Sequence, residues 1–136
     1  METMNKAHNM SAGPELDALL AEQVMRWRRF DNWSQAAGMQ QPFFLVGESG
    51  VVVYRHPDLG KSWSPSKNMA DAWDVVEKIE KTLNFQIDNV GLENKDQRRW
   101  RVLFGRSGDP ISVVADAETA PLAIARAALQ TVLPKS

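Results

Sequence analysis

Two short runs of arginine and tryptophan carry the side chains best suited to ligand chemistry, RWRR at residues 26–29 and RRWR at residues 98–101. An arginine guanidinium pairs with phosphate oxygens through two parallel hydrogen bonds, and an indole face stacks on a base. Such runs can therefore bind nucleotides. The alternative interpretation is a solvated charged face with Trp27 and Trp100 buried in the core.

Two other tryptophans, Trp33 and Trp63, fall in segments without regular periodicity, and we expect both side chains to be exposed. Exposed loop tryptophans are typical of binding surfaces and subunit interfaces. Loops on a rigid scaffold are also where binding residues are usually placed. The predicted ligand site therefore joins the loop that follows residue 53 to the arginines of a later strand. Its residues are Tyr54, Arg55, His56, Trp63, Arg99 and Arg101.

Motifs for catalysis are weak. SPSK at residues 64–67 matches the S-x-x-K pattern of serine acyl enzymes, but neither companion motif of that class is present. His56 and Asp58 flank a proline in a loop and imply no nucleophile. The chain has no cysteine, which excludes a thiolate metal site. We therefore predict no catalytic residue, no metal and no cofactor.

The composition limits the classes of partner. Sixteen basic and seventeen acidic residues leave a net charge of -1, whereas proteins that bind duplex nucleic acid usually carry a basic excess. No run approaches the ~20 apolar residues of a membrane span, and residues 1–13 lack the apolar core of a signal peptide. The expectation is a cytoplasmic protein of one domain over residues 14–136, preceded by a flexible leader over residues 1–13.

Helical periodicity predicts a first helix over residues 14–27 and a second one capped by Ser66 or Asn68. Between them, residues 31–42 are predicted to be a loop, and FFLV (43–46) and VVVY (51–54) to form a hairpin around GESG. The segment from residue 55 to residue 66 holds two prolines and a glycine, which predicts irregular structure. The apolar stripe of the second helix is expected to comprise Met69, Ala72, Trp73, Val76, Ile79 and Leu83. Trp73 is accordingly predicted to be a core anchor.

The second half of the chain predicts three strands and a helix. Residues 85–90 form the first strand, and the second strand alternates strictly, with Trp100, Val102 and Phe104 on one face and the two arginines on the other. Residues 111–115 form the third strand of this antiparallel meander. Pro121 stands in the first turn of the last helix, whose buried side is expected to hold Leu122, Ala125, Leu129 and Val132.

Two of these segments, WSPSKNMADAWDVVEKI (63–79) and TAPLAIARAALQTVL (119–133), resemble the phage ABA sandwich domain. Members of that family pair a helix of the pattern ST-D-I-A-A-A-W-E-V-V-E-K with a closing helix T-A-P-L-A-I-C-R-A-A-L. The resemblance implies an α+β fold, a compact α-β-α sandwich with a central antiparallel meander. Full helical cover of both sheet faces conflicts with the arginines on one face, which predicts that this face is partly open or that the arginines lie at an edge.

The family is largely without assigned chemistry, and the resemblance implies a phage protein that acts in the host bacterial cytoplasm. One hypothesis is a non-catalytic counter-defence protein that sequesters a nucleotide-derived immune signal of the host. The alternative is an interaction module that inhibits a host enzyme or defence complex by direct contact. Both use exposed Trp and Arg residues, which dominate interface hot spots. Apolar surface left on a small domain further predicts a homo-oligomer.

Overall fold

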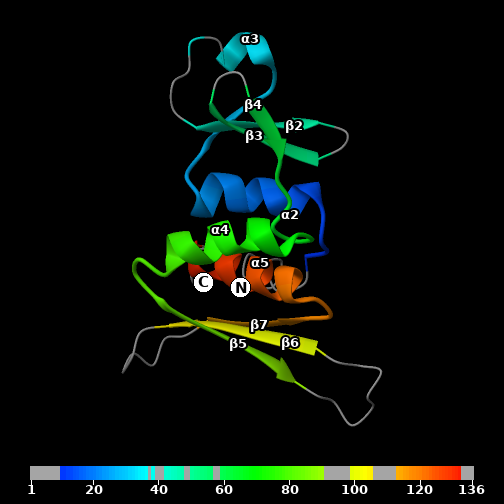
Figure 1. Cartoon of the computed structure of the whole chain (residues 1–136), viewed down its shortest axis with the longest axis vertical. Coiled ribbons are helices and arrows are strands. Elements are labelled where there is room, and N and C mark those ends of the chain that lie inside the picture. The colour runs from blue at the N-terminus through cyan, green and yellow to red at the C-terminus, as the bar shows by residue number, and fades with distance from the viewer. Residues whose placement is uncertain are drawn as a thin grey trace.

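The structure is a computed structural model of the chain, and it describes residues 10–36, 38, 42–47, 50–56, 59–90, 99–105 and 113–132. Two sheets lie on opposite sides of a layer of helices (Figure 1). The α+β class, the hairpin, the meander and the three principal helices are confirmed, and they stack as a sandwich. The helices form its central layer, and the meander, which was expected to be central, forms an outer layer (Figure 1). The arginines of the meander predicted that one of its faces is partly open or that they lie at an edge. Within the described residues, no helix covers the outer face of the meander.

The first sheet, sheet A, has the strand order β1-β2-β3-β4, and contains β1 (Arg28–Phe30), β2 (Phe43–Gly47), β3 (Gly50–His56) and β4 (Leu59–Ser62). The predicted hairpin is β2 and β3, which pair antiparallel from Gly47 opposite Gly50. Two strands were not predicted: β1 pairs parallel with β2, and β4 pairs antiparallel with β3. The prediction of irregular structure for the segment after Tyr54 is therefore wrong over β4. Gly60 permits that pairing, because a Cβ there would collide with the ring of Tyr54.

The first helix is shorter than predicted. It runs as α2 (Pro14–Leu19), widens into the π-helix η1 (Leu20–Val24), and ends before Trp27. The left-handed backbone of Arg26, with φ of 61°, turns the chain out of the helix and into β1. The predicted loop that follows contains one short helix, α3 (Trp33–Ala36), whose Gln35 amide donates to Asn32 Oδ1 at 3.1 Å.

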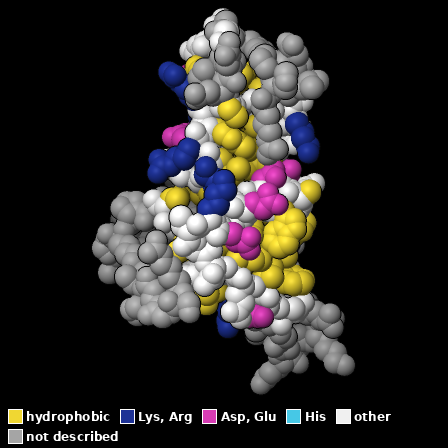
Figure 2. All heavy atoms as spheres, turned by 60° about the vertical axis from the view of Figure 1, so that its left-hand side comes forward, with side chains coloured by type: hydrophobic (Ala, Val, Ile, Leu, Met, Phe, Trp, Pro, Cys, Tyr) yellow, Lys and Arg dark blue, Asp and Glu magenta, His cyan; other side chains and the backbone are white. Residues whose placement is uncertain are grey.

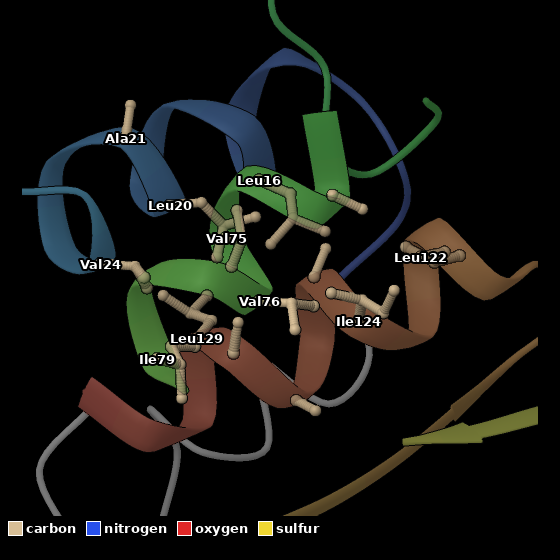
Figure 3. Close-up of a cluster of buried hydrophobic side chains, with 14 of the residues drawn as sticks. Leu16, Leu20, Ala21, Val24, Val75, Val76, Ile79, Leu122, Ile124 and Leu129 are labelled. Atoms are coloured by element: carbon tan, nitrogen blue, oxygen red, sulfur yellow. The ribbon is translucent and has the colours of Figure 1, made fainter. Parts of the chain in front are cut away.

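The other two helices are α4 (Met69–Ile79) and α5 (Ala120–Val132). Asn68 caps α4, since its Oδ1 accepts from the amide of Asp71 at 3.1 Å. Figure 3 shows α2, η1, α4 and α5 meeting through their apolar side chains. The core labelled there comprises Leu16, Leu20, Ala21, Val24, Val75, Val76, Ile79, Leu122, Ile124 and Leu129.

Sheet B is the meander of β5 (Asn84–Val90), β6 (Arg99–Gly105) and β7 (Val113–Ala117). The third strand extends to Ala117, two residues beyond its predicted end, and the predicted residues 111 and 112 are outside the described residues. The alternation in β6 is confirmed, because Val102 and Phe104 are buried and Arg101 is exposed. α5 packs on β6 and β7, so the inner face of this sheet closes the core.

Candidate functional site

The turn at residues 64–67 is the most densely hydrogen-bonded polar feature of the described structure. Ser64 Oγ donates to Asp17 Oδ2 at 2.7 Å, and the Ser66 amide donates to Asp17 Oδ1 at 2.9 Å. The Ser64 amide donates to Asp71 Oδ2 at 2.9 Å, and Ser66 Oγ accepts from the amide of Gly13 at 3.0 Å. Two carboxylates thus fix the turn between α2 and the start of α4. We refer to this arrangement as the Ser64 clamp.

Asp17 is almost completely buried in this clamp. Burial raises the pKa of its carboxyl above the ordinary value, while the hydrogen bonds from Ser64 and Ser66 and the charge of Lys67 oppose the rise. The SPSK motif therefore places its first serine against a carboxylate. Since Lys67 is exposed, the turn does not reproduce a serine hydrogen-bonded to its motif lysine. Its evident role is to anchor α4.

Three small pockets lined by described residues lie around the helical layer. One of about 180 Å³ borders the clamp and holds Asp17 and Lys67; another of about 450 Å³ is lined by Glu15, Glu22 and Arg29. The third, of about 260 Å³, is lined by Met25, Trp27, Asp74, Glu77, Lys78 and Lys81. In each of these pockets the acidic residues equal or outnumber the basic ones. Such a balance offers little attraction to a polyanion.

Trp63 lies inside the molecule, with 2% of its surface exposed, so the prediction of an exposed loop tryptophan is wrong here. Its amide donates to the carbonyl of Val51, its ring meets that of Trp27 edge-on at 4.8 Å, and its Nε1 donates to Asp74 Oδ2 at 3.3 Å. The residue ends β4 and joins sheet A to α4. The burial of Trp63 depends on the pairing of β4 with β3, which the local sequence did not indicate. The side chain of Trp33 is outside the described structure.

The predicted ligand residues divide between the two sheets. Tyr54 is on β3, where its ring stacks on Phe43 at 5.1 Å, and the side chains of Arg55 and His56 lie outside the described residues. Arg99 and Arg101 are on β6 in sheet B, across the helical layer in Figure 1. The described structure therefore does not bring these two groups into one pocket.

Both arginines of β6 face acidic side chains. Arg101 Nε lies 2.9 Å from Asp116 Oδ1, and the register places Arg101 between Asp88 and Asp116. The hydrogen bond with Asp116 and then the charges of Asp116 and Asp88 raise the pKa of Arg101. Arg99 Nη1 lies 3.9 Å from Glu118 Oε1. A phosphate would have to compete with these carboxylates.

The exposed aromatic surface lies instead on α4. Trp73 is 47% exposed and Met69 is 39% exposed, so the prediction that Trp73 anchors the core is wrong. The buried face of α4 comprises Asp71, Ala72, Val75, Val76 and Ile79. Two overlapping apolar stripes were available in this helix, and packing selects the one that contains Val75. A check for that second stripe could have found the exposed tryptophan from the sequence.

The ring of Trp73 meets Phe85 of β5 edge-on at 5.6 Å, and Phe85 in turn lies 5.4 Å from Phe104. Hydrophobic side chains reach the surface in the middle of Figure 2, beside acidic ones. The other half of the exposed face of α4 carries Asp74, Glu77 and Lys78 and borders the pocket beside Trp27. We refer to the exposed residues Met69, Trp73, Glu77 and Lys78, together with Asp74, as the α4 surface.

Among the described residues, no cluster of three or more His, Asp or Glu side chains is placed to hold a metal ion. The described helices also include none with the length and apolar character of a membrane span.

Comparison with known proteins supports the fold. The chain resembles a crystal structure of a phage protein from Bacillus cereus ATCC 14579 with a TM-score of 0.59 and 21% sequence identity. That match covers 91% of this chain and 95% of the other, and at this identity it shows the fold alone. No significant match is found among curated proteins. The model of the phage ABA sandwich domain matches residues 18–129, and the chain therefore belongs to the phage ABA sandwich domain family.

Proposed function

We propose that this phage-family protein is a non-catalytic binding protein that contacts another protein through the α4 surface. The observation that carries the proposal is the half-exposed ring of Trp73 on a capped, well-packed helix. Tryptophan is among the residues most enriched at interface hot spots, because one side chain covers a large area at a small cost in conformational entropy.

The α4 surface is built to be rigid. Phe85 supports one edge of the Trp73 ring, and the opposite face of the helix is buried through Val75, Val76 and Ile79. At its amino end the Ser64 clamp and the Asn68 cap fix the position of the helix. A side chain that is already ordered loses little entropy on binding, which favours affinity.

The surface also has the composition of an interface rather than of a nucleotide pocket. An aromatic and a methionine stand beside Asp74, Glu77 and Lys78, so apolar contact is bordered by charges of both signs. The nucleotide-sponge hypothesis would need a cationic concavity, whereas the pockets described above are balanced or acidic and Arg101 is bonded to Asp116. Direct protein contact is therefore the function that the geometry supports best.

Membership of a phage family suggests the kind of partner. We expect a host protein, and the phage would benefit when the activity of that protein is blocked. The test is affinity capture from host lysate, followed by titration of the purified partner. Trp73→Ala should weaken binding at least tenfold, as expected for a hot spot. Val114→Ala is the matched control, because Val114 is likewise an exposed hydrophobic residue, at 39%, but lies on β7. Equal binding by both variants would contradict the proposal.

Binding to a panel of nucleotides tests the alternative, the nucleotide-sponge hypothesis. Cyclic and linear nucleotides are added to the purified protein, and the melting temperature is recorded. A ligand at a hundred times its Kd adds about 2.7 kcal/mol of stability, which shifts the melting temperature measurably. We expect no shift. A clear shift that Trp73→Ala leaves intact would favour the sponge hypothesis and count against the α4 surface.

A further inference from the structure

The two edges of sheet B differ in how their backbone groups are satisfied. On β7, the carbonyl of Asp116 accepts from Arg126 Nη1 at 3.0 Å, and the carbonyl of Val114 accepts from Gln130 Nε2 at 3.4 Å. Both donors come from α5. An unprotected edge strand is a template for pairing with another chain, and proteins commonly block such edges with side chains. The β7 edge is blocked in this way.

The β5 edge has no comparable protection in the described part of the chain. β5 pairs with β6 on one side, and neither a described strand nor a described side chain bonds to its other side. Phe85 and Ile87 are half-buried on the helical side of the strand, while Gln86, Asp88 and Asn89 are exposed. By strand alternation, the outer face of the edge carries the polar Gln86 and Asp88, and the helical face carries Phe85, Ile87 and Asn89.

The strand register shows which backbone groups face this edge. In an antiparallel sheet, alternate residues direct both their N–H and C=O groups to the same neighbour. The carbonyls of Val114 and Asp116 bond to α5, so the backbone groups of these two residues point away from β6. Their partners in register, Leu103 and Arg101, therefore direct their own N–H and C=O groups to β5 instead of β7. Leu103 and Arg101 lie opposite Gln86 and Asp88. The backbone groups of Phe85, Ile87 and Asn89 therefore point to the open edge.

We propose that the β5 edge pairs antiparallel with β5 of a second copy of this chain, with the two-fold axis at Ile87. In that register Ile87 lies opposite Ile87 of the second copy, and Phe85 lies opposite Asn89 of the second copy. The Phe85–Asn89 pair occurs twice by symmetry, so there are three such pairs. Each pair exchanges two hydrogen bonds, about six in all. The two three-stranded sheets become one continuous sheet.

The side chains make this register self-complementary. On the outer face, Gln86 lies opposite Asp88 of the second copy, so an amide donor meets a carboxylate acceptor. Within one chain, Gln86 Nε2 already donates to Asp88 Oδ2 at 3.0 Å, which shows that this pair bonds readily. On the helical face, the two Ile87 side chains meet at the axis, and Phe85 of each copy lies opposite Asn89 of the other. No like charges of β5 stand directly opposite each other, which would be destabilising.

The dimer does not depend on the proposed function, because its contacts come from β5 and those of the proposed partner from α4. It would place both α4 surfaces on the same side of the joined sheet. A partner could then be held at two points. A failure of the dimer would leave single-site binding through Trp73 intact, so the two proposals fail separately.

Sedimentation equilibrium of the purified full chain tests the pairing. At micromolar concentration we expect a mass of twice the 15.3 kDa of one chain. Gln86→Asp places two carboxylates opposite each other and should raise the dimer Kd about tenfold. Gln86→Lys is the matched control, since a lysine opposite Asp88 should preserve the dimer.

A second variant tests the backbone. Asn89→Pro removes an N–H that faces the open edge and leaves the bonds between β5 and β6 in place, since proline is tolerated at strand edges. It should raise the dimer Kd at least tenfold. Circular dichroism and melting temperature verify that each variant folds. A parent protein that stays at the mass of one chain up to about 100 µM would overturn the proposal. So would a folded Gln86→Asp or Asn89→Pro variant with unchanged dimer affinity.

Discussion

Helices α4 and α5 lie against each other, yet they use their apolar residues differently. α5 is closed in by sheet B and by the other helices, and eight of its residues are buried. α4 buries a single stripe and leaves Met69 and Trp73 exposed. The difference arises from position, because α5 stands in the centre of the sandwich while α4 has solvent on one side.

Side-chain size is matched to these positions. The buried face of α5 contains four alanines, Ala123, Ala125, Ala127 and Ala128, which let a sheet and two helices approach it closely. α4 carries its largest side chain outward. Small residues let neighbouring elements approach a central helix from several sides, whereas a peripheral helix can present a large residue to a partner. The predictions below test this contrast.

The largest effect is expected in the central helix. Leu129→Ala should lower the free energy of unfolding by about 3 to 4 kcal/mol, because the side chain is 1% exposed and its removal leaves a cavity in the core. Urea denaturation measures the loss. A cost below about 1 kcal/mol would mean that the core around α5 relaxes freely.

The clamp that fixes α4 should make stability depend on pH. Burial raises the pKa of Asp17 in the folded protein, so the folded state keeps this proton to higher pH than the unfolded state does. Stability should therefore fall as pH rises from the ordinary carboxyl pKa of 3.8 through the raised value. Asp17→Asn should remove this slope. An amide offers one acceptor oxygen to the two donors, Ser64 Oγ and the Ser66 N–H, so the loss of one acceptor should cost about 1 to 3 kcal/mol. Urea titrations of both proteins across that pH range compare the slopes. An unchanged slope in the variant would assign it to other groups.

Trp73→Ala should cost less than the loss of Leu129, about 1 to 1.5 kcal/mol. Nearly half of the side chain is already in water, and alanine is the better helix former. The same urea experiment applies. A loss of about 3 kcal/mol or more would show that Trp73 is a core residue, as its sequence spacing first predicted.

The smallest effects should distinguish the starts of the two helices. Asn68→Ala should cost about 1 kcal/mol, since it removes the 3.1 Å cap of α4. Thr119→Ala at α5 should cost less, because its hydroxyl accepts from Leu122 at 3.4 Å and Pro121 already favours the first turn. Melting temperatures of the two variants give the order. Equal losses would mean that the caps do not distinguish a peripheral helix from a central one.

Features set by nearby residues were predictable from the sequence. The hairpin around GESG, the alternation in β6 and the cap of α4 all depend on neighbours in the chain, and the structure contains each of them. The family segments at residues 63–79 and 119–133 indicated the same fold class. For α5, the predicted buried side is confirmed at Leu122, Ala125 and Leu129, whereas Val132 in the last turn is only partly buried.

Features set by distant residues were not predictable. β1 and β4 are short strands that exist because β2 and β3 offer their edges, so their local sequences show no strand pattern. Trp63 looked like a loop residue, but the ring of Trp27, 36 positions earlier, covers it. The described members of the predicted site lie on different sheets for the same reason, since the sheet that holds each residue decides its neighbours. The hypothesis that those six residues bind a ligand stays a prediction.

The Ser64 clamp also has a consequence for how the molecule comes apart. Its bonds from Gly13 to Ser66 and from Ser64 to Asp17 join positions separated by 53 and 47 residues. They tie α2 to the segment that connects β4 of sheet A to α4, and so link sheet A to the helical layer. The buried amides of Ser66 and Gly13 should therefore exchange with deuterium only through global unfolding, at the rate of the slowest amides in the core. Sheet A and the helices would then behave as one cooperative unit, although sheet A has few direct contacts with sheet B.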